Sequence, residues 1–437
     1  MQGDIIIVGG GAGGLELASK LGRKLGRLRG LRSPVTLVDS RLTHIWKPSL
    51  HEVAAGTLDA HQEGLSYQML AHDNGFNFAY GALIAIDAAA HTVTVAAVQS
   101  DDGQTILPER TLAFSSLVIA VGSTSNYFGV PGAQEHTISL NASEDAEHFR
   151  LGLLKQLAQA DQRKADGQAG QVDIVIIGGG ATGVELAAEL REASWVYAAY
   201  GFQHLQPQTD VRITLLEGAP RILAPLTEQV AAAAHKLLEE RGIRVVTDCR
   251  VSAIAPDHVL DASGTIYPAS LCVWAAGIRA PAFLGQLGLP TTKGGQIEVD
   301  GQLRVKGIAD LYAMGDCAAC LGVDGKLVPP RAQAAHQQAD YLFRQFMRRA
   351  RGQQMQAAPY VYRDHGSLVS FGHSNTVGSL MGSLRGMNFF VEGYFARMMY
   401  ASLHLMHHAA VLGVLKTAVL AVARFLIKRS SPLVKLH

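Results

Sequence analysis

The residues Ile5–Leu17 read IIIVGGGAGGLEL, and the chain repeats this pattern at Ile174–Leu186 as IVIIGGGATGVEL. A continuous apolar run of this kind is typical of a parallel strand buried on both faces. In the Gly-x-Gly-x-x-Gly that follows, the first glycine permits a tight turn, the second lets backbone approach a pyrophosphate, and the third lets the helix pack on the strand. The N-terminus of that helix attracts phosphate. Two such units predict that the chain binds two dinucleotides.

The predicted cofactor contacts of each unit are the small loop residues and an acidic residue after the next strand. Asp39 closes a strand expected at Val35–Val38, and Glu217 closes one expected at Val211–Leu216. A carboxylate there accepts hydrogen bonds from a ribose hydroxyl and repels a 2′-phosphate, so NADH is favoured over NADPH, although Arg221 weakens this preference. The loop positions are Gly9, Gly11, Ala12, Gly13, Gly14, Gly178, Gly180 and Gly183.

The composition is that of a globular protein with sizeable cores. The chain has 437 residues, of which 48% are hydrophobic and 17% charged, enough for two or three domains. The formal net charge of +1 argues against nucleic acid as a partner. Four cysteines without a disulfide-like pattern favour a reducing, cytosolic setting. We expect no signal peptide, and no apolar run reaches the roughly 18 uncharged residues of a membrane-spanning helix.

Further ligand-facing positions are expected in loops at the carboxyl ends of predicted strands. The loop His44–Ala54 follows the strand that Asp39 closes, and it combines aromatic, basic and hydroxyl groups. Glycines follow the strands expected at Leu117–Val121 and Leu271–Trp274, and a Gly-Asp pair ends the strand that begins at Leu311. In an open parallel sheet, ligands bind at these ends of the strands. The candidate positions are Lys47, Pro48, Gly122, Gly277 and Asp316.

The order of the motifs GGGAGG, AVGS, GGGATG, WAAG and MGDCA resembles that of the two-dinucleotide flavin reductases, in which the first fold holds FAD and the second holds the nicotinamide cofactor. The fuller pattern is similar to the type II NADH:quinone oxidoreductases. It comprises HIWKPSLHEVAAG at His44–Gly56, AQAAHQ at Ala332–Gln337 and a basic, apolar tail. The family's quinone-site motif Ala-Gln-x-Ala-x-Gln is matched, whereas Trp46 departs from the smaller residue expected there.

The resemblance implies roles for individual residues. Asp316 contacts the ribityl or pyrophosphate part of FAD, and Glu185 lies beside the nicotinamide. Gln333 and Gln337 lie near the flavin ring and the quinone, with Ala332 at the cofactor. From its position alone, Glu185 could equally serve only to stabilise the helix, because a carboxylate near a helix N-terminus interacts favourably with the helix dipole. The two glutamines, four residues apart, share one helix face and would also fit a solvated surface.

The resemblance also implies the architecture. We expect an α/β fold of two Rossmann-like domains, the second inserted in the first. The expected boundaries are 1–142 and 290–371 for the FAD-binding domain, 143–289 for the NADH-binding domain, and 372–437 for a C-terminal membrane-binding region.

The cysteines and histidines give weaker signals. Cys317 and Cys320 have the spacing of a redox dithiol, but Cys317 directly follows Asp316 and is expected to pack against the cofactor. Disulfide reductases of this fold carry a cysteine pair after the first acidic strand, where this chain has none. His404, His407 and His408 form a cluster without a carboxylate or cysteine close by in the sequence. A metal site is one interpretation of this cluster, but an interfacial or structural role is favoured, and we predict no metal site.

The tail is expected to form an amphipathic helix with a basic polar face. From residue 377 onward it carries seven basic side chains and one acidic one, 7 − 1 = +6. Thr417, Arg424 and Lys428 fall on one helix face, and the opposite face carries Val411, Leu415, Val419, Val422 and Leu426. This pattern predicts a helix that lies in the membrane interface and is attracted by anionic lipid. A dimer interface or packing on the body is the alternative. Lys416, at the face boundary, is a candidate donor to the quinone.

The predicted function is FAD-dependent oxidation of NADH with two-electron reduction of a membrane quinone, without proton pumping. The expected setting is the respiratory chain, as a monotopic homodimer on the cytoplasmic face of the inner membrane. The sequence does not decide between ubiquinone and other quinones as the acceptor. One alternative is a soluble FAD-dependent NADH reductase with a protein or oxygen as acceptor, and another is a flavin-bound redox sensor. Quinone-dependent oxidation of NADH separates these possibilities.

Overall fold

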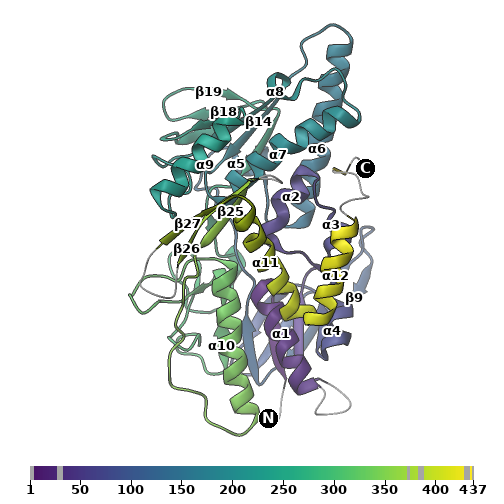
Figure 1. The fold of residues 1–437 in the computed structure, drawn as a ribbon. Helices are drawn as coiled ribbons and strands as arrows, with labels where there is room; N and C mark the ends of the chain where they lie inside the picture. Colours follow the sequence, from purple (N-terminus) through teal and green to yellow (C-terminus); the bar gives the residue numbers. More distant parts are fainter. Residues whose placement is uncertain (1–3, 27–32, 372–374, 382–387, 428–433, 436–437) are drawn as a thin grey trace.

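The computed structural model describes residues 4–26, 33–371, 375–381, 388–427 and 434–435. Two parallel sheets of five strands form the two halves of the molecule (Figure 1). The first sheet has the order β23-β11-β1-β2-β5. Its strands are β1 (Ile5–Val8), β2 (Val35–Asp39), β5 (Asn77–Tyr80), β11 (Ser116–Ile119) and β23 (Leu311–Ala313). Helices α1 (Ala12–Leu25) and α10 (Ala332–Ala350) pack against each other beside this sheet.

The second sheet repeats this plan with the order β13-β20-β14-β15-β16. Its strands are β13 (Ile138–Ser139), β14 (Val172–Ile177), β15 (Val211–Leu216), β16 (Arg244–Val246) and β20 (Leu271–Trp274). The accompanying helices are α6 (Ser143–Ala165), α7 (Ala181–Tyr200) and α9 (Glu228–Glu240). After β20 the chain returns to the first sheet, where β23 pairs with β11. The second Rossmann-like unit is therefore inserted in the first, as predicted.

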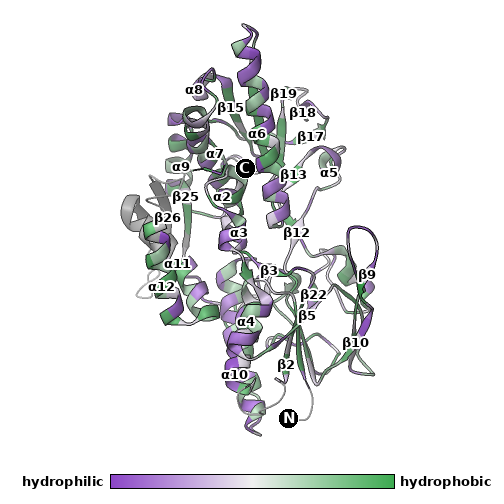
Figure 2. Cartoon of the chain, turned by 90° about the vertical axis from the view of Figure 1, so that its right-hand side faces the viewer, coloured by the Kyte–Doolittle hydropathy of each residue, from purple (hydrophilic) through white to green (hydrophobic). Residues whose placement is uncertain are grey.

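Smaller elements connect and cover the two sheets. Outer helices such as α6 and α10 carry both hydrophilic and hydrophobic residues along their length (Figure 2). The remaining elements before β20 are β3 (Thr43–His44), η2 (Lys47–Ser49), α2 (Leu50–Ala55), α3 (Ala60–Glu63), β4 (Leu65–Ser66), α4 (Tyr67–Asn74), β6 (Leu83–Asp87), β7 (Thr92–Val95), β8 (Val98–Gln99), β9 (Thr105–Leu107), β10 (Arg110–Ala113), β12 (Thr124–Ser125), α5 (Ala133–His136), α8 (Pro207–Asp210), β17 (Val251–Ile254), β18 (His258–Asp261) and β19 (Ile266–Pro268). After β20 come β21 (Ile278–Arg279), η3 (Ala282–Gln286), β22 (Ile297–Glu298), η4 (Gly315–Cys317) and β24 (Ala318–Ala319).

Most predicted elements lie where the sequence places them. The alternating stretch Thr92–Val98 is divided between β7 and β8. Helix α7, which follows the second glycine-rich loop, continues to Tyr200. Its extension is held by tertiary contacts, since the buried Tyr197 hydroxyl donates to Ala55 O at 2.9 Å. Helix α1, which follows the first glycine-rich loop, ends at Leu25.

The C-terminal part consists of a three-stranded antiparallel sheet and two helices. The strands are β25 (Ser367–Phe371), β26 (Asn375–Met381) and β27 (Asn388–Glu392), and the helices are α11 (Gly393–Leu412) and α12 (Val414–Ile427). The boundary expected between 371 and 372 falls between the paired strands β25 and β26. Figure 1 shows α11 and α12 side by side next to α1. Among the described residues, no helix has the length and apolar character needed to span a bilayer.

The tail forms two helices instead of one continuous helix. Gly413 has φ +85° and separates α11 from α12. Val411 therefore belongs to α11 and is fully buried, so its prediction on the outer apolar face was wrong. The other apolar positions of that face are exposed, whereas Thr417 is buried on the opposite side. Lys428 lies outside the described residues. The amphipathic pattern is thus real for α12, and its polar face packs on the body.

Candidate active site

The two glycine-rich loops have the same geometry, and each leaves room for a ligand at a helix N-terminus. Gly9 and Gly178 have φ +103° and +112°. A Cβ on Gly14 would lie 1.9 Å from Gly9 O, and one on Gly183 would lie 2.0 Å from Gly178 O. In contrast, a Cβ on Gly11 or Gly180 would meet no described atom within 4 Å. No described side chain caps α1 or α7, so their amide groups can bind a pyrophosphate. The loops therefore fit dinucleotides such as FAD and NADH.

The acidic residues Asp39 and Glu217 hold these loops in equivalent ways. Asp39 Oδ2 accepts a hydrogen bond from Gly10 N at 2.6 Å, and Glu217 Oε2 accepts one from Gly179 N at 2.5 Å. Burial raises the pKa of the Asp39 carboxyl above its ordinary value. Both carboxylates lie at the strand ends where the ribose of a bound dinucleotide is expected. The positions of Asp39 and Glu217 are therefore compatible with the predicted hydrogen bonds to ribose.

The predicted FAD residues Lys47 and Asp316 lie close together. Lys47 Nζ donates to Ser123 O at 3.1 Å, and Ser123 Oγ donates to Asp316 Oδ2 at 2.7 Å. Burial lowers the pKa of Lys47, although the Asp316 carboxylate acts in the opposite direction. The structure thus brings three separate chain segments to one place in the first domain.

The other predicted cofactor positions lie at helix starts, in turns or after strands. A Cβ on Gly13 would lie 3.0 Å from Ala335 O, so Gly13 lets α1 approach α10. Ala12 and Ala332 are the first residues of α1 and α10. Gly122 and Gly277 have φ +72° and +71°, and Pro48 lies in the turn η2. Each is at a strand end or a helix start, as the sequence predicts.

Glu185 is buried in the second domain and contacts a histidine that the sequence analysis did not single out. Its Oε2 lies 3.7 Å from His51 Nδ1, and its Oε1 accepts a hydrogen bond from Ser370 N at 3.0 Å. Burial raises the pKa of Glu185 to about 7. Burial lowers the pKa of His51, but the carboxylates of Glu185, Glu52 and Glu189 raise it above its ordinary value. Glu185 can therefore change its protonation state near neutral pH.

The amides of Gln333 and Gln337 both bind the segment 363–366. Gln333 Nε2 donates to Asp364 Oδ1 at 3.2 Å and to Gly366 O at 3.1 Å. Gln337 both donates to Arg363 O at 2.7 Å and accepts from Arg363 N at 3.0 Å. The two side chains are thus engaged by protein groups, which rules out a fully solvated helix face. They fasten the segment before β25 to the start of α10.

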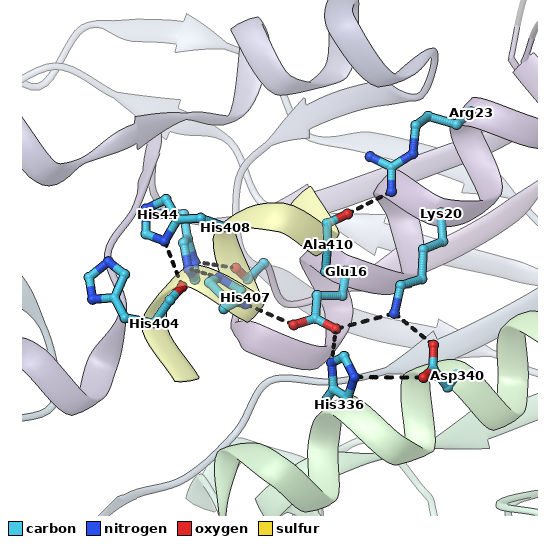
Figure 3. A network of polar contacts seen from close by, with 11 residues as sticks. Glu16, Lys20, Arg23, His44, His336, Asp340, His404, His407, His408 and Ala410 are labelled. Carbon is cyan, nitrogen blue, oxygen red and sulfur yellow. Dashed lines mark hydrogen bonds and ion pairs between the residues drawn. The ribbon is translucent and has the colours of Figure 1, made fainter. Parts of the chain in front are cut away.

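A buried network around Glu16 connects α1, α10 and α11 (Figure 3). Glu16 Oε2 lies 2.5 Å from His336 Nδ1, and Glu16 Oε1 lies 2.8 Å from His407 Nδ1. His407 Nε2 is 2.9 Å from His44 Nε2, and His44 Nδ1 is 2.9 Å from Gly10 O. Trp46 lies against the His407 ring at a centroid distance of 4.4 Å. The network therefore links the quinone-motif helix and the C-terminal region to the first glycine-rich loop.

This line of hydrogen bonds holds one proton more than two neutral imidazoles supply. Gly10 O and the ionised Glu16 carboxylate only accept hydrogen bonds. The three contacts between them, through His44 and His407, need three hydrogens, and two neutral rings carry two. Burial raises the pKa of Glu16, but the hydrogen bonds from His336 and His407 outweigh it and lower that pKa to about 2. Burial lowers the pKa of His44 to about 3.

Lys416 lies on the surface of the molecule, where it binds an acidic residue. Lys416 Nζ forms an ion pair with Asp73 Oδ2 at 2.6 Å, and its side chain is 59% exposed. This position between α12 and α4 does not support a role as quinone donor.

Cys317 and Cys320 are buried free thiols, and burial raises the pKa of each to about 11. Such thiols lack the reactivity of a redox dithiol.

The internal repeat contains a signal that would have identified Glu16. In the two copies GGGAGGLEL and GGGATGVEL, Glu16 and Glu185 occupy the same position. Since Glu185 is already expected beside the nicotinamide, the matching Glu16 is a candidate for a second buried functional carboxylate. His336 lies inside the AQAAHQ motif, but its link to Glu16 requires the packing of α10 on α1.

Comparison with known proteins agrees with this geometry. Residues 3–339 match the family described as pyridine nucleotide-disulphide oxidoreductase. The chain is 36% identical to the type II NADH:quinone oxidoreductase of Haemophilus influenzae, over 99% of this chain and 100% of that one. It is 30% identical to the demethylphylloquinone reductase NdbB of Synechocystis, over 86% and 87% of the two chains. The fold and the two loops define a pyridine nucleotide-dependent oxidoreductase of this class. Within the class, the chain belongs to the type II NADH:quinone oxidoreductase family.

Solved structures support the same fold. NDH2 from Plasmodium falciparum, determined in complex with NADH, superposes with a TM-score of 0.78 over 96% of this chain and 98% of its own. The sulfide:quinone oxidoreductase of Aquifex aeolicus superposes with a TM-score of 0.71 over 94% and 92%. Sequence identities of 18% and 19% limit both comparisons to the architecture.

Proposed function

We propose that this protein oxidises NADH and reduces a membrane quinone through bound FAD, without proton pumping. NADH, one proton and a quinone give NAD⁺ and a quinol. The observation that carries the proposal is the end-to-end similarity to the Haemophilus influenzae enzyme, together with two loops whose middle glycines face open space. The chemistry that FAD supplies when bound is acceptance of a hydride and onward transfer of two electrons.

The residues of this chain bind and orient the reactants. The first loop, Asp39, Lys47 and Asp316 hold FAD, and the second loop and Glu217 hold NADH. Glu185 lies at the nicotinamide, where its ionisation near neutral pH affects binding of the charged product. Gln333 and Gln337 act at the quinone side through the segment 363–366, which their amides hold on α10.

We place the enzyme on the cytoplasmic face of the inner membrane as a monotopic homodimer. The outward face of α12 supports this placement, because its apolar side chains are exposed while Arg424 and Lys416 bind the body. Lys416 then anchors α12 to α4. A helix of this kind lies in the interface of a bilayer, where a quinone is also dissolved. Light scattering of the detergent-solubilised protein tests the dimer.

The deciding experiment measures the flavin absorbance and NADH oxidation of the purified protein, with and without a short-chain quinone. Bleaching of the flavin by NADH followed by rapid quinone-dependent turnover supports the proposal. Turnover that is indifferent to quinone would indicate an enzyme with another acceptor. Flavin that NADH does not bleach would indicate a sensor, and a folded protein that binds no flavin would overturn the proposal altogether.

A further inference from the structure

A second polar cluster lies beside the Glu16 network and is not used by the proposed reaction. His404 and His408 are one turn apart on α11, and their rings stack with centroids 4.3 Å apart. Glu63, the last residue of α3, faces them. One ligand atom from each of the three residues lies within 4.8 Å of the other two. The fold thus supplies the carboxylate that the histidines lack in the sequence.

The hydrogen bond of His408 to the backbone leaves its other ring nitrogen available to a ligand-binding site. His408 Nδ1 lies 3.0 Å from His404 O, and because a carbonyl only accepts, His408 Nδ1 carries the proton. This fixes the tautomer and leaves the Nε2 lone pair directed at the cluster, as in many metal-binding histidines. A cavity of about 10 Å³, lined in part by all three residues, adjoins them.

The cluster already binds a cationic group. Arg424 Nη1 lies 3.1 Å from His404 Nε2, and Arg424 Nη2 lies 3.4 Å from His408 Nε2. The same guanidinium forms an ion pair with Glu63. Because a guanidinium only donates hydrogen bonds, both Nε2 atoms accept and carry no proton in this arrangement. Together with the Glu63 carboxylate, the two rings therefore attract a cation. The guanidinium comes from α12, whose Lys416 also forms an ion pair with Asp73 of α4.

We propose that Glu63, His404 and His408 form a binding site for a divalent transition-metal ion of the zinc class, for which Arg424 competes. Two imidazole nitrogens and a carboxylate oxygen are a ligand set that zinc takes, with water completing a tetrahedron. The metal ion and the guanidinium need the same lone pairs, so binding of one displaces the other. Metal binding therefore also removes one attachment of α12 to the body.

The test uses full-length, FAD-loaded protein in detergent, titrated with Zn²⁺ against a fluorescent chelator. We expect one site that His404→Gln and His408→Gln weaken at least about tenfold each, since each removes a ligand. Arg424→Gln is expected to tighten binding by about tenfold or more, because it removes the competitor. The matched control is His72→Gln. His72 is an exposed histidine whose Nδ1 lies 3.3 Å from Asp73 Oδ1, and it does not belong to the cluster of Glu63, His404 and His408.

Two results would overturn the proposal. One is unchanged affinity in both histidine variants, and the other is unchanged or weaker binding in Arg424→Gln. If Arg424→Gln does not fold, Arg424→Lys serves in its place, because a single ammonium group cannot engage all three partners as the planar guanidinium does. Addition of Co²⁺ gives an independent readout. We expect the visible absorption of tetrahedral cobalt in the wild type and its absence in His408→Gln.

Discussion

Glu16 and Glu185 occupy the same position of the two glycine-rich repeats, and each buries its carboxylate against a histidine. Glu16 lies 2.8 Å from His407 Nδ1, and Glu185 lies 3.7 Å from His51 Nδ1. The repeat therefore duplicates a buried carboxylate as well as a phosphate-binding loop. The two environments separate their acidities, since the pKa of Glu16 is lowered to about 2 and that of Glu185 is raised to about 7. The equivalent residues thus have different consequences for stability and pH dependence.

The first prediction concerns the ionised carboxylate. Glu16→Gln is expected to lower the free energy of unfolding at pH 7 by on the order of 3 kcal/mol, because the hydrogen-bonded ion pairs with His336 and His407 are lost. Since the folded pKa of Glu16 is depressed, this stabilisation is present above about pH 4.5 and fades as the pH falls toward 2. Denaturant titration at several pH values measures it.

Asp340→Asn is the control for Glu16→Gln. Asp340 belongs to the same network through Lys20 and His336, but its side chain is 37% exposed. We expect it to change stability by less than about 1 kcal/mol. An equal loss in the two variants would show that burial of Glu16 adds nothing.

The second prediction concerns the pH dependence caused by Glu185. Its pKa in the folded protein is raised, so the stability present below about pH 4.5 is lost as the pH rises through 7. Glu185→Gln cannot ionise and should therefore flatten the fall in the thermal midpoint between about pH 5 and 8. Calorimetry of the two proteins across this range measures the difference. Glu240→Gln, on the exposed surface of α9, should leave the wild-type profile unchanged.

The third prediction separates the two half-reactions at Gln333. Gln333→Ala should depress quinone turnover more than the reduction of flavin by NADH, because its amide holds the segment 363–366 on the quinone side. Stopped-flow reduction and steady-state quinone turnover give the two rates. Asp364→Asn weakens the same contact from the other partner. If it reproduces the defect, Gln333 acts through this segment, whereas equal loss of both rates would contradict the role.

Local patterns predicted much of the fold but little of the tertiary network. β15 and β20 begin and end at the predicted residues, because each is a largely apolar segment followed by an acidic residue or, a few residues on, by a glycine. The break at Gly413 was missed, since one glycine inside an apolar helical pattern only lowers the expectation of a helix. The pairing of Glu63 with His404 depends on how α11 packs against α3, and no periodicity within either segment reports it.

The fourth prediction concerns the outward face of α12. Leu415 and Val419 are 80% and 62% exposed, so replacing both with aspartate should not disturb the core. Because burial of two such side chains in the bilayer contributes about 3 kcal/mol, the double variant should bind anionic vesicles more than tenfold more weakly. Flotation measures binding, and flavin reduction by NADH should stay unchanged. Leu151→Asp, on the exposed side of α6, is the matched control. Undiminished flotation together with a loss of the dimer would instead assign this face to contact between subunits.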